Sequence, residues 1–172
     1  MYSGLSQNFW INLAGFQLAW WCAVLFGNRS LPVLCLFILF HLLFHSLVFS
    51  EFKVLILCGL CGFSIDLLLT LSGVFRFDTA LPPLWLLLLW FCFSATLRQS
   101  LAFFNRNIFM ASLCGGVFGS ITYTAAESMG AVSSGIPEVT FIVLLMVIWM
   151  VLFPVLLKLS VCISKAGNYD AI

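Results

Sequence analysis

The chain has 172 residues, of which 63% are hydrophobic and 8% are charged, and its mean hydropathy is +1.18. A soluble domain is about 25% charged, so this composition excludes an ordinary water-soluble fold. The net charge of +1 argues against a nucleic-acid partner, which a strongly basic surface would bind. We therefore predict an all-α fold, a polytopic integral membrane bundle whose main partner is the lipid bilayer.

Six apolar segments follow one another along the chain, and we interpret each as a transmembrane helix, which needs roughly 20 residues. The predicted spans cover about residues 9–26, 31–49, 54–75, 82–97, 108–129 and 139–157. Glu51-Phe-Lys53 then forms a short link before the third span, and residues 98–107 form a loop or an interfacial helix. No loop is long enough for a separate domain, so residues 1–172 are predicted to be a single transmembrane domain.

The first predicted span carries its small residues on one side. Asn12, Gly15, Ala19 and Ala23 share that side, and such a small-xxx-small surface lets a second helix approach closely. Gln17 is the other polar side chain of the span. We take Asn12 and Gln17 as candidate polar contacts in the bundle interior or with a ligand.

The second predicted span contains two histidines four residues apart, His41 and His45, which lie on one helix face. A metal site needs three or four ligands, and the nearest other candidates, Cys58 and Asp66, belong to another helix. We therefore predict that the two histidines form hydrogen bonds between helices, and we assign no metal and no cofactor. A contact between His41 and Asp66 is one possible arrangement.

The third predicted span contains a carboxylate, Asp66, close to its middle. A carboxylate there costs about 2.5–3.5 kcal/mol to insert into a bilayer, so it should face protein. Three glycines share its helix face and should allow close packing: Gly59, Gly62 and Gly73. We expect Asp66 to find its partners on the first, second or fifth helix, because the fourth and sixth offer little beyond Ser94 and Thr96. A structural and a functional role for Asp66 remain equally open.

The fifth predicted span is the least hydrophobic. Gly116, Gly119 and Tyr123 share one face, and Glu127 lies about 60° to its side, at 100° per residue. We take the glycines as packing positions and Tyr123 and Glu127 as candidate polar or ligand contacts. The chain contains no G-x-S-x-G or H-E-x-x-H motif, so we assign no catalytic residue.

The basic residues are distributed unevenly over the two sides of this topology. Lys53, Arg98, Arg106, Lys158 and Lys165 fall on one side, and Arg29 and Arg76 fall on the other. Because short cytoplasmic loops carry an excess of Lys and Arg, both termini are predicted to be cytoplasmic.

Four runs of the chain resemble a family of small bacterial inner-membrane proteins catalogued as a domain of unknown function: NFWINLAGFQLAWWCAVL, GFSIDLLLTLSGVFRF, PLWLLLLWFCFSATLRQSL and ITYTAAESMGAV. Genes of such proteins lie near those for cyclopropane-type fatty-acyl phospholipid synthases. The resemblance therefore implies a location in the bacterial inner membrane and a role linked to membrane-lipid modification. It also implies another membrane protein or a lipid-modifying enzyme as a partner.

A looser resemblance rests on the pattern Gly62-Phe-Ser-Ile-Asp66. In a six-helix chain of this size, it is similar to the rod-shape-determining membrane protein D and to the substrate-binding subunits of energy-coupling-factor vitamin transporters. Those transporter subunits dock a partner through a small-xxx-small first helix, a role that Gly15, Ala19 and Ala23 would take here.

Three classes of function remain. We favour a non-catalytic binding or scaffold component linked to membrane-lipid modification. The alternatives are a substrate-binding subunit of a small-molecule transporter and an intramembrane enzyme acting on lipid.

Overall fold

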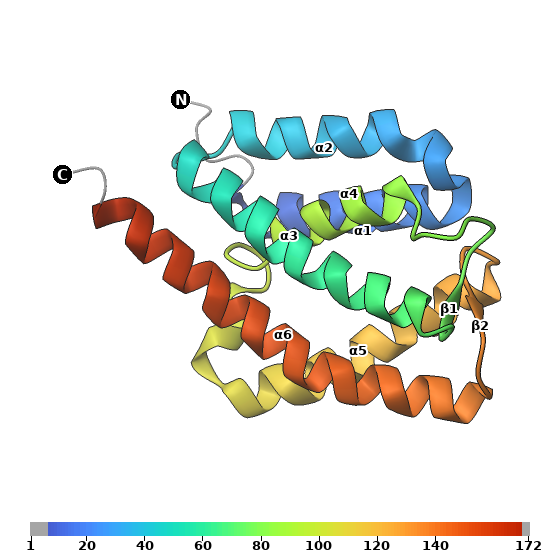
Figure 1. The fold of residues 1–172 in the computed structure, drawn as a ribbon. Helices are drawn as coiled ribbons and strands as arrows, with labels where there is room; N and C mark the ends of the chain where they lie inside the picture. Colours follow the sequence, from blue (N-terminus) through green and yellow to red (C-terminus); the bar gives the residue numbers. More distant parts are fainter. Residues whose placement is uncertain (1–6, 170–172) are drawn as a thin grey trace.

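The computed structural model describes the backbone of residues 7–169 and the side chains of residues 7–163, and in this part of the chain it contains six α-helices. They are α1 (Phe9–Phe26), α2 (Leu31–Leu43), α3 (Val48–Leu71), α4 (Leu84–Ser94), α5 (Ile108–Ser128) and α6 (Glu138–Tyr169). Figure 1 shows that the helices run back and forth between two ends of the molecule. We call the end where α1 begins and α6 ends the terminal end, and the opposite end the strand end.

The strand end holds a small antiparallel sheet and the turn between α1 and α2 (Figure 1). β1 (Phe75–Arg76) pairs with β2 (Ser133–Ser134) in the register Phe75 to Ser134 and Arg76 to Ser133. A 3-10 turn, η2 (Gly27–Ser30), folds α2 back along α1. Gly27 has a φ of 54°, a conformation that residues with a Cβ rarely adopt, so a glycine suits this reversal.

The third helix differs from its prediction at both ends, because it begins at Val48 rather than Val54 and ends at Leu71. The prediction that Glu51-Phe-Lys53 forms a link is therefore wrong. A carboxylate in the first turn of a helix is stabilised by the free N–H groups there, so Glu51 suits a helix start. Asp66 consequently lies five residues before the end of α3, or about 8 Å along the axis, and not near the middle of the helix.

Other predicted bounds also change. α2 ends at Leu43, and α4 contains 11 residues. Turns after α4 lead into a 3-10 helix, η3 (Ala102–Arg106), so the predicted loop at residues 98–107 is neither extended nor α-helical. α6 continues far beyond residue 157, to Tyr169.

Four helical segments in the described part of the chain are long and apolar enough to cross a membrane: Phe9–Leu43, Val48–Leu71, Ile108–Ser128 and Glu138–Ile163. The first includes the η2 turn and is therefore a hairpin of two helices. α4 is apolar but shorter, because 11 residues span about 16 Å. These segments indicate a helical membrane protein, whereas a count of six membrane spans does not follow from them.

The core is organised around α4, which packs against α1, α2 and α3. At its centre the indole rings of Trp90 in α4 and Trp149 in α6 stack at 5.5 Å with an interplanar angle of 9°. Gly62 of α3 lies against the Trp90 ring, and Gly119 of α5 lies against the Trp149 ring. We call these four residues the glycine–indole stack. It joins four helices, and each glycine leaves the space that a ring occupies.

Candidate functional site

A groove runs along the bundle, with α1 and α5 as its walls and α4 and α6 at its base. Its volume is about 600 Å³, within the range of about 300–1,000 Å³ typical of ligand pockets. None of the described residues that line it is charged, and many are aromatic. Phe9, Phe118 and Ile121 on its walls are exposed and belong to segments able to cross a membrane. The groove therefore opens sideways, towards the hydrocarbon that would surround these helices.

Asp66 lies behind the lining of this groove with an exposed fraction of 2%. The indole Nε1–H of Trp90 donates to Oδ2 at 2.6 Å, and the Tyr123 hydroxyl lies 2.8 Å from Oδ1 and 2.7 Å from Oδ2. Both donors line the groove. No ion pair among the described residues includes Asp66, so two neutral groups hold this carboxylate.

The partners of Asp66 agree only in part with the sequence analysis. Tyr123 comes from the fifth helix, one of the expected elements, whereas Trp90 comes from the fourth, which we had set aside. The proposed contact with His41 is wrong, because His41 binds Glu51. We missed Trp90 because we counted it only as an apolar residue, although its indole N–H needs an acceptor when buried.

A second buried polar cluster lies at the terminal end and is centred on Glu51, whose side chain is 0% exposed. Its Oε1 lies 3.0 Å from Nε2 of His41, and its Oε2 lies 3.4 Å from Nε2 of His45. Arg98 donates to Oε2 at 2.9 Å and to Ser50 Oγ at 3.2 Å. The cluster joins α2, α3 and the turn after α4, and we call it the Glu51 cluster. The sequence analysis missed Glu51 and Arg98 as interior residues because it placed both in links between helices.

The backbone determines which nitrogen of His45 carries the proton. The Leu47 N–H donates to His45 Nδ1 at 3.0 Å, so that nitrogen holds a lone pair and the proton is on Nε2, facing Glu51. Gln99, whose amide lies 3.0 Å from the same Nε2, can turn its oxygen towards it, whereas the backbone N–H can only donate. Burial lowers the pKa of His45 below its ordinary value of 6.5, although the charge of Glu51 opposes this shift. His45 is therefore neutral at neutral pH.

These assignments bear on metal binding, because His41, His45 and Glu51 offer three ligand atoms within 4.8 Å of one another. A ligating histidine uses one nitrogen for the metal and normally donates a hydrogen bond from the other. In His45 the other nitrogen accepts from Leu47, so the nitrogen that faces Glu51 is protonated and cannot bind a cation. The guanidinium of Arg98 also contacts the only carboxylate of the group. The Glu51 cluster does not fit a metal ion.

We expect elemental analysis of the full chain, purified without a histidine tag, to find far less than one transition-metal ion per chain. The His41→Ala variant should give the same metal content, because the residual signal would be adventitious. A stoichiometric metal that disappears in His41→Ala would contradict this prediction.

The remaining polar candidates have separate positions. Asn12 is buried, its Nδ2 donates to the Ala95 carbonyl at 3.0 Å, and its Oδ1 accepts from the hydroxyl of Ser100 at 2.7 Å. It thus fastens α1 to the turn after α4. Gln17 is exposed on the groove wall. Glu127 lies away from Asp66, and its Oε1 accepts from the N–H of Ser134 in β2 at 2.9 Å.

The predicted packing residues fall into two groups. Ala19 and Ala23 are fully buried, and four glycines allow close helix contacts: Gly59 against Phe91, Gly62 against Trp90, Gly116 against Met146 and Met150, and Gly119 against Trp149. Gly15 and Gly73 do not act as packing positions, since a Cβ on either would meet nothing within 4 Å. Gly73 instead has a φ of 77° in the turn that ends α3.

The fold and the groove define a class, the helical membrane proteins with a laterally open apolar cavity. A family model described as protein of unknown function (DUF2878) matches residues 9–155. Because the match covers most of the chain, the chain belongs to this family. Searches of curated proteins and of solved structures found no match.

Proposed function

We propose that the chain is a non-catalytic lipid-binding component of the bacterial inner membrane, and that its groove holds part of a membrane lipid. The observation that carries this proposal is the groove itself, with a volume of about 600 Å³. Its lining is apolar and aromatic, and its walls belong to segments that can cross a membrane. An acyl chain suits such a lining because it requires no hydrogen-bond partner along its length.

The topology we propose contains six spans, with the terminal end on the cytoplasmic side. Support comes from the basic residues, since Lys53, Arg98, Arg106 and Lys158 belong to elements at or near the terminal end, whereas Arg29 and Arg76 lie at the strand end. The side chain of Lys165 lies outside the described residues. An excess of Lys and Arg on one side favours the cytoplasm for that side.

The resemblance to proteins encoded near phospholipid-modifying synthases gives this binding a purpose. We propose that the chain presents a bound lipid to another membrane protein or to a lipid-modifying enzyme. The uncharged lining also fits binding better than catalysis, because none of its described residues is an acid or a base.

The test is to count lipids retained by the full chain. The protein is reconstituted in nanodiscs of phosphatidylethanolamine and phosphatidylglycerol, exchanged into mild detergent, and analysed by native mass spectrometry. We expect about one retained lipid per chain, and a marked loss in Cys114→Trp, because Cys114 lines the groove and an indole there would fill it. Cys35→Trp is the matched control, since Cys35 is exposed on α2 and does not line the groove.

Equal lipid retention in the wild type and Cys114→Trp would contradict lipid binding in the groove. A retained molecule other than a lipid, lost in Cys114→Trp alone, would instead favour a substrate-binding subunit of a small-molecule transporter.

A further inference from the structure

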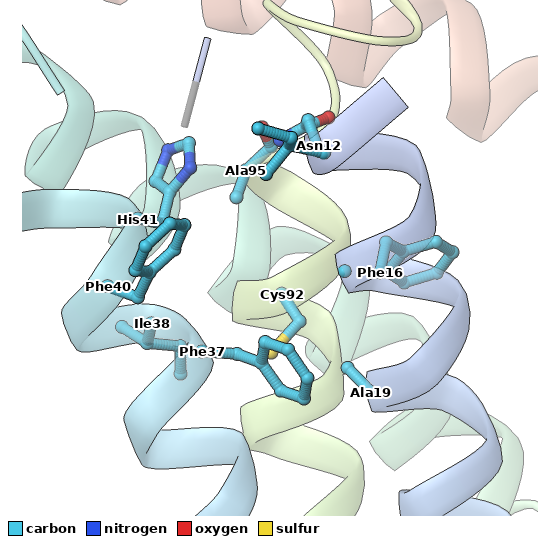
Figure 2. A pocket seen from close by; sticks show the side chains of 11 residues that line it. Asn12, Phe16, Ala19, Phe37, Ile38, Phe40, His41, Cys92 and Ala95 are labelled. Atoms are coloured by element: carbon cyan, nitrogen blue, oxygen red, sulfur yellow. The ribbon is translucent and has the colours of Figure 1, made fainter. Parts of the chain in front are cut away.

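A second, smaller cavity lies between α1, α2 and α4, apart from the groove. Figure 2 shows the side chains around it, with the imidazole of His41 on the side of the cavity where Asn12 and Ala95 meet. Its volume is about 110 Å³, several times the roughly 10–15 Å³ that one water molecule requires. Apart from Asn12, His41 and Cys92, the lining side chains are hydrocarbon, and Gly15 adds no side chain.

The polar groups of this cavity differ in how well they are satisfied. The amide of Asn12 donates to the Ala95 carbonyl, and its oxygen accepts twice from Ser100. His41 has one partner in the described part of the chain, Glu51, which its Nε2 meets at 3.0 Å. The His41 side chain is only 7% exposed, so its second nitrogen, Nδ1, is a buried polar atom without a protein partner.

The proton position on His41 decides what Nδ1 can bind. Nε2 faces a carboxylate, and a carboxylate accepts only, so the proton is on Nε2 and Nδ1 holds a lone pair. Arg98 already offsets the charge of Glu51, which removes the need for a second cation on His41. The cavity therefore presents one hydrogen-bond acceptor in an otherwise apolar surrounding, and its complement is a ligand with an O–H donor and a short apolar body.

We propose that this cavity binds a hydroxyl group, the chemistry of a glycerol headgroup or of a free small alcohol, through a hydrogen bond to His41 Nδ1. Glu51 acts as the positioning residue, because its contact with Nε2 fixes the acceptor on the opposite side of the ring. His41 lies in the last turn of α2, at the terminal end of the bundle. That position suits the polar boundary of a membrane, where lipid hydroxyls are found.

Gly15 provides a variant that closes the cavity without altering its polar groups. It lines the cavity, and a Cβ there would meet no atom within 4 Å, so a leucine side chain can enter the space without displacing the backbone. The matched control is Ala14→Leu, one residue earlier on α1, because Ala14 is exposed and lines neither cavity.

The experiment uses the full chain, labelled with ¹⁵N-histidine, in phosphatidylcholine nanodiscs. Short-chain phosphatidylglycerol, free glycerol and short-chain phosphatidylcholine are each titrated while the His41 Nδ1 resonance is followed by NMR. We expect phosphatidylglycerol to shift this resonance, and Gly15→Leu to weaken its apparent affinity roughly tenfold, the size of one hydrogen bond. Ala14→Leu should behave as the wild type.

A shift with phosphatidylglycerol alone assigns the hydroxyl to a lipid headgroup, and an equal shift with free glycerol assigns it to small alcohols in general. No shift with either ligand, an equal shift with phosphatidylcholine, or an unchanged response in Gly15→Leu would overturn the proposal. The Cys114→Trp variant of the groove should leave this titration unchanged, so the two sites fail or succeed separately.

Discussion

Gly62→Val is expected to lower the free energy of unfolding by about 1–3 kcal/mol, the usual cost of overpacking a core. The reason is that a Cβ at Gly62 would overlap the Trp90 ring, which is held on its other face by Trp149. The ring therefore has no free space into which it can move. Unfolding of the detergent-solubilised protein, followed by circular dichroism against denaturant, measures the change.

The control for this prediction is the same substitution at Gly15. It replaces a glycine in another helix of the same bundle, but a Cβ there meets nothing within 4 Å. We expect Gly15→Val to change stability by less than about 0.5 kcal/mol, as substitutions without a packing cost usually do. Equal unfolding midpoints for the two variants would show that the glycine–indole stack does not restrict this position.

Glu51→Ala is expected to have a larger effect, about 3–5 kcal/mol, because removing one member of a buried ion pair leaves the other uncompensated. Arg98 would lose its carboxylate, and the Nε2 protons of His41 and His45 would lose their acceptor. Denaturant unfolding in detergent again provides the measurement. Because the variant could fail to accumulate, Glu51→Gln, which keeps one acceptor, should fall between it and the wild type.

Two comparisons make the Glu51 result specific. Asp78→Ala removes an exposed carboxylate at the strand end and should change stability by less than about 0.5 kcal/mol. The double variant Glu51→Ala with Arg98→Ala should recover part of the loss, because it no longer strands a cation. A Glu51→Ala protein as stable as Asp78→Ala would show that the cluster contributes nothing to folding.

The sequence predicted the helices better than it predicted their ends. Apolar runs separated by turns gave the six helical segments, since hydrophobic runs determine which segments can be buried. Polar residues misled the assignment of Glu51 and Lys53, which looked like a link but form the first turn of α3. A polar residue marks a helix end only when it has no partner, and the partner of Glu51 is 47 residues away at Arg98.

The same reasoning explains how much of the candidate sites the sequence revealed. A period of 100° per residue placed Gly59, Gly62 and Asp66 on one face of α3, and all three are buried in the structure. The period does not indicate which helix a face meets, so the contact between Asp66 and Trp90 was missed. The groove and the smaller cavity were also missed, because each lies between helices that are distant in the chain.

Asp66 and Glu51 both belong to α3, 15 residues or about 22 Å apart along its axis. Each is hydrogen-bonded to residues of other elements, Asp66 to α4 and α5 and Glu51 to α2 and Arg98. A rod fastened at two distant points can neither slide along its neighbours nor turn about its axis without breaking one of the fastenings. α3 is therefore the stationary member of the bundle, and any widening of the groove to admit a lipid must come from movement of its walls, α1 and α5.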